Sequence, residues 1–375
     1  MKSLLKSKHY VIVSLLKKSI MSFIHKLTLQ DIRSIDGSGM AAHITDMGNH
    51  IREAIALTGT ALERFTPPAG IRSIIIAGIG GSAIGGDLVK SYLGGKISVP
   101  LIVNRSYELP SFANEETLVV VSSYSGNTEE TLAMFEEAVR RKLHIVCVTT
   151  GGKLGARAKE LGLVTISQRP GMQPRAALAY SFVPILLLLD RMGLTQGESQ
   201  NLEAAATLLD TLAERYGIMN LVETNQAFSL AGQLTHRIPA VYSTDSYEAV
   251  NLRWRGQLQE NAKHLAFGNV LPEMNHNEIN GWAHPIDVLQ HLFVILLRSK
   301  EDEHPRVSKR FEVVKEILGG KQIPIVEVTA EGNTRLERMF SLISIADWTS
   351  FYLALFTGTD PTSIPAIDLL KQRMG

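Results

Sequence analysis

The chain has 375 residues, with 38 Lys or Arg side chains against 37 Asp or Glu. This near balance excludes a protein that is drawn to nucleic acid or to an anionic membrane by its overall charge, so any anion that it binds must be recognised locally. The single cysteine excludes an internal disulfide and a cysteine-based zinc cluster, and the length allows two domains with substantial cores.

The chain begins with a basic and apolar stretch, MKSLLKSKHYVIVSLLKKSI. Lys17 and Lys18 interrupt its apolar run and no cleavage pattern of small residues follows, so we expect an extension before Met21 rather than a signal peptide. The longest apolar run, residues 176–189, contains Pro184 and is shorter than the roughly 18 residues of a membrane span, which predicts a buried helix. Without a disulfide or an export signal, we expect a cytoplasmic protein that does not bind membranes.

Strand and helix patterns alternate from about Ile71 onward. Apolar runs rich in Val and Ile stand between segments of 3.6-residue periodicity; the runs are SIIIAG, VPLIV, TLVVVSS, HIVCVTT and LVTIS. Fully apolar strands between helices predict a parallel sheet with both faces covered. Cys147 lies in one of these strands, where we expect a small hydrophobic side chain to be buried.

A polar segment with two glycines, RMGLTQGESQ at 191–200, precedes the strongly helical NLEAAATLLDTLAERYG. A second alternation follows, through IPAVYS, KHLAFGNV, VLQHLFVILLR and IPIVEVTA, and it ends in helical patterns around LISIADWTSFYLALF and PAIDLLKQRM. We therefore predict an α/β protein with two doubly wound parallel-sheet domains in tandem. The boundaries that we expect are a lead-in at 1–35, a first domain at 36–195 and a second domain at 196–375.

Two glycine turns follow strands of the first domain, at the sheet edge where parallel sheets bind their ligands. The first turn is AGIGGSAIGGD, residues 77–87, whose glycines allow a tight turn and a close approach of the backbone to a ligand. Gly78, Gly80 and Ala83 satisfy the loose dinucleotide-binding pattern, so a nicotinamide or flavin enzyme is the alternative interpretation of this turn. No Asp or Glu ends the next strand to hold a ribose, although Arg105 could accept a 2′-phosphate.

The second turn is SSYSGNTEET, residues 122–131, between an apolar strand and a helical pattern. Hydroxyls at 123, 125 and 128 and the backbone N–H groups around Gly126 are neutral donors at the start of a helix, a combination that suits a small dianion such as a phosphomonoester. The alternative is that a Ser or Thr only caps the helix, for which one hydroxyl suffices. Neither turn contains Lys or Arg, which separates both from a nucleotide P-loop.

The second domain must supply any chemistry, and its most unusual stretch is NLRWRGQLQENAKHLAFGNVLPEMNHNEINGW, residues 251–282. Glu260 follows an amphipathic helix and precedes a strand, and His276 lies in a polar loop. A carboxylate that moves a carbon-bound proton and an imidazole that opens a sugar ring are the groups that an aldose–ketose isomerase needs. From the residues alone, a helical Glu is more often exposed or ion-paired, and a metal site of His276, Glu278 and His284 matches no zinc or iron spacing.

At these residues the sequence resembles the bifunctional phosphoglucose/phosphomannose isomerases, a family with sugar isomerase (SIS) domains, and the resemblance runs from DIRSIDGSGM to LLKQRM. The motifs that carry it are GIGGSAIGGD, SSYSGNTEET, QPRAAL, QENAKHLAFGNVLPEMNHNEINGW and DPTSIPAIDLLK. The long fourth motif is the most specific, because the two turns are shared with sugar-phosphate regulators. The resemblance implies two SIS domains, a homodimer with the active site at the subunit interface, and no metal or organic cofactor; residues 1–20 have no counterpart in it.

The resemblance also assigns roles to single residues. The substrate phosphate would be held by Gly81, Ser82, Ser123, Ser125 and Thr128. Arg175 would lie at the reacting end of the sugar and Glu260 would carry the proton between C2 and C1. His276, donated by the partner subunit, would assist ring opening, and Lys371 would share that step unless it is an exposed helix-end cation. The hydroxyl that admits mannose 6-phosphate would belong to Thr362 or Ser363.

We therefore expect an isomerase that interconverts glucose 6-phosphate, and mannose 6-phosphate, with fructose 6-phosphate through a cis-enediol(ate). The negative charge of this intermediate needs a fixed cation such as Arg175. Two alternatives stay open. One is a non-catalytic SIS protein that binds a sugar phosphate and regulates a partner, and the other is an isomerase of another sugar phosphate.

Overall fold

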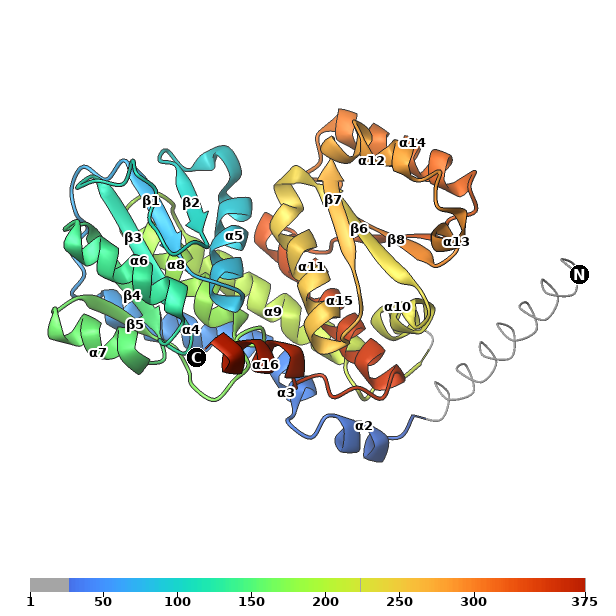
Figure 1. Cartoon of the computed structure of the whole chain (residues 1–375), viewed down its shortest axis with the longest axis horizontal. Helices are drawn as coiled ribbons and strands as arrows, with labels where there is room; N and C mark the ends of the chain where they lie inside the picture. Colours follow the sequence, from blue (N-terminus) through green and yellow to red (C-terminus); the bar gives the residue numbers. More distant parts are fainter. Residues whose placement is uncertain (1–26, 223, 375) are drawn as a thin grey trace, which may run out of the picture.

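The structure is a computed structural model and describes residues 27–222 and 224–374; the extension that we expect before Met21 lies outside the described residues. Two parallel β-sheets stand side by side, and helices fill the space between them (Figure 1). The α/β class with two parallel sheets, predicted from the alternating patterns, is confirmed.

The first sheet has the strand order β2-β1-β3-β4-β5, with all neighbouring strands parallel. Its strands are β1 (Ser73–Ala77), β2 (Leu101–Asn104), β3 (Thr117–Ser123), β4 (His144–Thr149) and β5 (Val164–Ser167). All seven residues of the central strand β3 are buried, because helices cover both faces of the sheet, and β-branched Val side chains suit such a position. The five apolar runs that predicted these strands are confirmed.

Helices cover both faces of the first sheet. The outer face carries α6 (Glu129–Arg140) and α7 (Gly152–Glu160), and the inner face carries α4 (Met47–Leu62), α5 (Gly81–Leu93) and α8 (Leu178–Arg191). α6 buries residues 131, 134, 135 and 138, which is the spacing of one helix face. α8 confirms the buried helix that we predicted at 176–189, and it contains Pro184 in its interior.

The second sheet has the order β7-β6-β8-β9 and is also parallel throughout. Its strands are β6 (Ile238–Thr244), β7 (Phe267–Leu271), β8 (Leu292–Arg298) and β9 (Ile325–Thr329). Its outer face packs on α14 (Pro305–Gly319), and its inner side faces α9 (Glu198–Tyr216), α10 (Gln226–Leu234), α11 (Glu248–Asn261) and α15 (Arg335–Phe356). The two sheets therefore share one strand pattern, with β2, β1, β3 and β4 corresponding to β7, β6, β8 and β9.

One helix in the described part of the chain, α15, is long and apolar enough to cross a membrane by length and composition. However, 94% of its apolar window is buried inside the protein, so α15 is a core helix. Thr334 and Glu337 fix its start with a reciprocal capping box.

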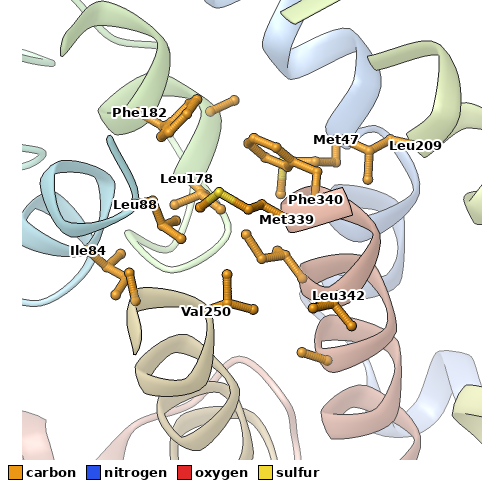
Figure 2. Packing of buried hydrophobic residues seen from close by; sticks show 14 of the residues in the cluster. Met47, Ile84, Leu88, Leu178, Phe182, Leu209, Val250, Met339, Phe340 and Leu342 are labelled. Atoms are coloured by element: carbon orange, nitrogen blue, oxygen red, sulfur yellow. The ribbon is translucent and has the colours of Figure 1, made fainter. Parts of the chain in front are cut away.

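One hydrophobic core fills the space between the two sheets. Phe182 of α8 meets Phe340 of α15 edge to face, with 5.3 Å between the ring centroids. Figure 2 shows side chains from α5, α8, α11 and α15 pointing into the same cluster, and such a close-packed interior fixes the two sheets relative to each other. α9 packs on both α4 and α15. Because no single element separates the two halves, the domain boundary near residue 195 stays a prediction.

The described chain ends in α16 (Pro365–Met374), which has no buried side chain. In Figure 1 this helix, in dark red, lies below α9 between the two sheets. The remaining short helices are α2 (Leu29–Ile35), α3 (Met40–Thr45), η1 (Gly94–Lys96), η2 (Asp245–Tyr247), η3 (Glu273–Asn275), α12 (Glu278–Gly281) and α13 (Ile286–Leu289).

Candidate active site

The two glycine turns meet at the carboxyl end of the first sheet, because β1 and β3 are neighbours there. The Ser82 hydroxyl, in the first turn of α5, accepts a hydrogen bond of 3.0 Å from the backbone N–H of Tyr124. Gly78 has no room for a side chain, since a Cβ there would lie 2.8 Å from the carbonyl oxygen of Ser122. The two turns therefore form one continuous surface at the edge where such sheets bind ligands.

The hydroxyl groups of the second turn are not used to cap α6. Thr128 occupies the N-cap position but makes no side-chain capping bond, and its Oγ1 lies 3.0 Å from the Oγ of Ser123. Ser125 is exposed, and its Oγ accepts a local bond of 3.2 Å from the N–H of Asn127. The first N–H groups of α6 have no partner inside the helix. This geometry favours the anion-binding interpretation of the turn over the capping one.

A loop that our sequence analysis missed supports the second turn. Gly126 has a φ of +67°, and a Cβ there would lie 1.8 Å from the carbonyl oxygen of Gly151, so this position requires glycine. The N–H groups of Thr150 and Leu154 donate to the carbonyl oxygens of Tyr124 and Gly126 at 3.1 and 2.9 Å. The loop after β4 thus fixes the shape of the hydroxyl turn, and the adjacent glycines of TTGGK were the signal that could have revealed it.

Arg175 is 4% exposed, so its guanidinium is buried. Its Nε donates to Oδ1 of Asn261 at 2.7 Å, and its Nη2 donates to the carbonyl oxygens of Pro361 and Thr362 at 2.6 and 2.7 Å. The remaining nitrogen, Nη1, lies 3.4 Å from Oε2 of Glu260. Burial lowers the pKa of Arg175, and the Glu260 carboxylate opposes that shift; an arginine nevertheless stays charged in proteins.

Glu260 lies within the last turn of α11 rather than after the helix, and its side chain is 37% exposed. The first glycine turn lies against Pro174, the residue before Arg175. A Cβ at Gly81 would lie 2.7 Å from the carbonyl oxygen of Pro174. The structure thus brings the two turns, Arg175 and Glu260 together within one chain. A dianion site beside a fixed cation and a carboxylate can hold a phosphorylated substrate and move a proton next to its carbonyl group.

His276 and Lys371 are not brought to Glu260 within this chain. His276 is exposed and follows the carboxyl end of β7, whereas Glu260 precedes the start of that strand. β7 has five residues, which at about 3.3 Å per residue separates its first and last residues by roughly 13 Å. Lys371 is exposed on α16. Within residues 27–222 and 224–374, the hydrogen bonds and ion pairs of Glu260 and Arg175 include neither side chain, so both roles stay predictions.

The metal alternative gains no support from the geometry. The carboxylate of Glu278 accepts hydrogen bonds from the hydroxyl of Tyr242 and from Nδ2 of Asn269, the latter at 2.9 Å. These contacts tie Glu278 to the strands β6 and β7. Throughout the described residues, no group of three His, Cys, Asp or Glu side chains is arranged to hold an ion.

Our sequence analysis also missed the polar side chains that hold Arg175. Arg253, Gln257 and Asn261 recur every four residues along α11 and are all buried. Arg253 and Gln257 both donate to Asp347 of α15, and Arg253 also donates to the carbonyl oxygen of Arg175 at 3.2 Å. The helical spacing is visible in the sequence, but a polar stripe on a helix ordinarily faces solvent, and only the position of α15 shows that this one is buried.

Comparison with known proteins agrees with this geometry. A family model described as the bacterial phospho-glucose isomerase C-terminal SIS domain matches residues 223–374. A bifunctional phosphoglucose/phosphomannose isomerase of Caldicellulosiruptor bescii is 40% identical over 305 residues, which is 81% of this chain and 90% of the relative. One of Aquifex aeolicus is 36% identical over 305 residues, again 81% of this chain and 90% of the relative.

Solved structures show the same fold at lower identity. A hypothetical protein from Thermus thermophilus has a TM-score of 0.68 at 16% identity, covering 98% of this chain and 95% of that one. Together with the turns, the buried arginine and the carboxylate beside it, the similarity to the two relatives establishes that the chain belongs to the family of bifunctional phosphoglucose/phosphomannose isomerases.

Proposed function

We propose that the protein interconverts glucose 6-phosphate and mannose 6-phosphate with fructose 6-phosphate through a cis-enediol(ate). The observation that carries the proposal is the Glu260 carboxylate, 3.4 Å from the buried guanidinium of Arg175, whose neighbour Pro174 lies against Gly81 of the first glycine turn. The relatives that the chain matches over most of their length have both activities in their names. A sensor of sugar phosphates needs the turns but not the carboxylate–guanidinium pair, so the geometry favours the enzyme over the regulator.

The substrate phosphate binds at the two hydroxyl turns. The side-chain hydroxyls of Ser82, Ser123, Ser125 and Thr128 and the backbone at Gly81 converge where α5 and α6 begin. Both helices direct the positive ends of their dipoles toward a bound anion, and the first N–H groups of α6 add donors that have no partner inside the helix. Because neither turn contains Lys or Arg, the site suits one monophosphate rather than a nucleotide polyphosphate.

Glu260 is the base of the reaction. It takes the proton from C2 of the open-chain aldose, which leaves the cis-enediol(ate), and then returns that proton to C1, while a hydroxyl proton moves between the oxygens of C1 and C2 to give the ketose. Negative charge develops on oxygen in the intermediate, and Nη1 of Arg175 is the fixed cation that stabilises it. No other reactant is consumed, because the reaction only moves hydrogen within the sugar.

His276 of a second copy completes each site in a homodimer and opens the sugar ring, with Lys371 sharing that step. In support, His276 is exposed and follows the carboxyl end of β7, whereas Glu260 precedes the start of that strand, so His276 is better placed to serve another copy. Mixing the inactive Glu260→Gln and His276→Ala proteins after reversible dissociation tests this. If His276 acts between subunits, mixed dimers regain one intact site, and activity returns to about a quarter of the wild-type value; no recovery would refute the arrangement.

The hydroxyl of Thr362, rather than that of Ser363, admits the mannose epimer. Its Oγ1 is buried without a hydrogen-bond partner in the described part of the chain, and its carbonyl oxygen accepts from Arg175 at 2.7 Å, whereas Ser363 is exposed. Thr362→Val keeps the shape but removes the hydroxyl. It should lower kcat/KM for mannose 6-phosphate by about tenfold more than for glucose 6-phosphate, and equal losses on both substrates would exclude this role.

The decisive experiment replaces Glu260 with Gln. Glu260→Gln should lower kcat by about 10³-fold, because a positioned general base contributes about 10² to 10⁴-fold, while fructose 6-phosphate should still raise the melting temperature of the variant. Glu248→Gln, at the exposed start of the same helix, is the matched control and should keep kcat. If Glu260→Gln turns over substrate at the wild-type rate, Glu260 is not the base. Solvent deuterium incorporation at C2, measured across pentose, hexose and heptose phosphates, identifies the substrate.

We place the enzyme in the cytoplasm, where hexose phosphates enter glycolysis and gluconeogenesis. The balanced charge of 38 basic against 37 acidic side chains supports a protein that acts on a small metabolite rather than on nucleic acid or a membrane. Fractionation of the producing cells, with activity assayed in the soluble and membrane fractions, tests this location.

A further inference from the structure

We propose that Asn261 is a positioning residue, which acts through Arg175 by aiming one edge of its guanidinium at the substrate. This inference rests on the place of Arg175 at the reacting end of the sugar in the proposed function. Asn261 is the neighbour of Glu260 and is fully buried. Its carboxamide joins Arg175 on one side to α15 on the other.

The hydrogen bonds of Arg175 leave one nitrogen for the substrate. A guanidinium has five N–H donors, one on Nε and two on each Nη. Oδ1 of Asn261 accepts the hydrogen bond from Nε, and the carbonyl oxygens of Pro361 and Thr362 accept the two hydrogen bonds from Nη2. The contact of Nη1 in the described structure is the long one of 3.4 Å to Glu260. Nη1 is therefore the edge that faces the C1 and C2 oxygens of a sugar held between the turns and the base.

α15 fixes the orientation of the Asn261 carboxamide. Nδ2 of Asn261 donates to the Oγ of Ser350 at 3.0 Å, and that Oγ donates in turn to the carbonyl oxygen of Asp347 at 2.9 Å. Because Nδ2 is used in this way, Oδ1 is the atom that accepts from Nε of Arg175. The carboxamide cannot rotate without losing both bonds.

A second set of contacts holds the backbone of Arg175. Asp347 accepts from Nη2 of Arg253 at 3.0 and 2.8 Å, and the same Nη2 donates to the Arg175 carbonyl oxygen at 3.2 Å. The side chains of Arg253 and Asp347 are both 3% exposed, so each needs the other to offset the loss of water. Asp347 and Ser350, one helical turn apart on α15, thus hold the main chain and the side chain of Arg175.

Without Asn261, Nε of Arg175 would lose its acceptor, and the guanidinium, held then by its two Nη2 bonds, would turn about them toward Glu260. A closer ion pair would stabilise the charged form of Glu260 and weaken it as a base, and it would turn Nη1 away from the sugar. A misplacement of about 1 Å costs roughly 10²-fold in rate. We expect the loss in kcat rather than in KM, because the turns that bind the phosphate are not changed.

The test compares Asn261→Ala with Asn251→Ala in the full-length protein, with fructose 6-phosphate as the substrate. Asn251 is a matched control, since it lies on the same helix, is fully buried, and donates from Nδ2 to the carbonyl oxygens of Val241 and Asn269. Asn261→Ala should lower kcat by about 30- to 100-fold and change KM by less than about threefold. Asn251→Ala should lower the melting temperature but keep kcat within about threefold, and an equal kcat in the two variants would overturn the proposal.

A double-mutant comparison separates positioning from general stability. In an Arg175→Ala background, Asn261→Ala should change kcat by less than about threefold, because the side chain through which it acts is absent. A further loss of about tenfold or more would overturn the inference. Wild-type activity of Arg175→Ala alone would instead refute the proposed function of Arg175.

Ser350→Ala keeps the inference testable if Asn261→Ala does not fold. This variant frees the carboxamide of Asn261 but leaves its bond to Arg175, and it also removes the hydrogen bond from Ser350 to the carbonyl oxygen of Asp347. We expect kcat to fall by about 3- to 10-fold with KM unchanged. A kcat equal to that of the wild type would show that the anchored carboxamide does not matter.

Discussion

Replacing Gly81 with Ala tests whether the first glycine turn, where we propose that the substrate phosphate binds, is in rigid contact with the residues next to Arg175. A Cβ at position 81 would lie 2.7 and 2.8 Å from the carbonyl oxygen and carbon of Pro174, where ordinary contacts begin at 3.4 Å. The residue before Arg175 must therefore move away by about 0.7 Å, and a displacement of this size at a catalytic group costs on the order of 10- to 100-fold in rate. The backbone itself is not strained, since Gly81 is the first residue of α5 and has no positive φ.

The assay measures kcat and KM separately, together with the free energy of unfolding in urea. Gly81→Ala should lower kcat by about 10- to 100-fold, and it should lower the unfolding free energy by about 1 to 3 kcal/mol, because the added Cβ forces backbone atoms of Pro174 to move. Gly256→Ala is the control: a Cβ there meets nothing within 4 Å, so this variant should be slightly more stable and fully active. Wild-type kcat in Gly81→Ala would show that the turn moves without displacing Arg175.

Two further predictions concern the buried polar groups of each half. Burial alone would raise the pKa of Asp302, but hydrogen bonds from Arg338, Tyr247 and Ser299 outweigh it and hold the pKa below its ordinary value of 3.8. The stabilisation is therefore present above about pH 4 and is lost as the pH falls further. Asp302→Asn should lower the unfolding free energy by about 3 kcal/mol at pH 7, with a smaller difference at pH 3, and a difference that does not depend on pH would contradict this. Burial raises the pKa of the Cys147 thiol to about 12, so a thiol reagent at neutral pH should label one thiol per chain in urea but almost none in the native protein; rapid labelling of the native protein would place Cys147 outside the core.

Much of the fold could be predicted from the sequence, because local patterns determine it. Runs of Val and Ile between helical periods predicted the strands of both sheets, and a run with Pro184 that was too short for a membrane predicted the buried helix α8. The hydroxyl turn was also predictable, since glycine and hydroxyl residues after a buried strand have few other uses. The loop that supports it was not recognised, because a glycine pair after β4 predicts only a turn. The contact of Gly151 with Gly126 appears only in the folded structure.

The partners of Arg175 could not be predicted, because no local pattern reports contacts between distant parts of the chain. Asn261 is 86 residues from Arg175 and Pro361 is 186 residues away. The preference of Thr for helix N-caps is a real local signal, yet the Thr128 hydroxyl lies against Ser123 instead of capping α6. Burial of Arg253 likewise depends on α15, which packs on α11 only in the folded protein.

The contact between Gly81 and Pro174 also bears on which sugars can react. It joins the first glycine turn to the residue before Arg175 through backbone atoms, so a change of side-chain rotamer cannot alter the distance between the turn and the Arg175 backbone. When a sugar is bound by its phosphate, the number of intervening carbons sets the distance from the phosphate to its carbonyl group. In the proposed function, pentose and heptose phosphates would therefore bring that group short of, or beyond, the Arg175 guanidinium, and the missing side chain of Gly81 is expected to make the enzyme select sugars by chain length.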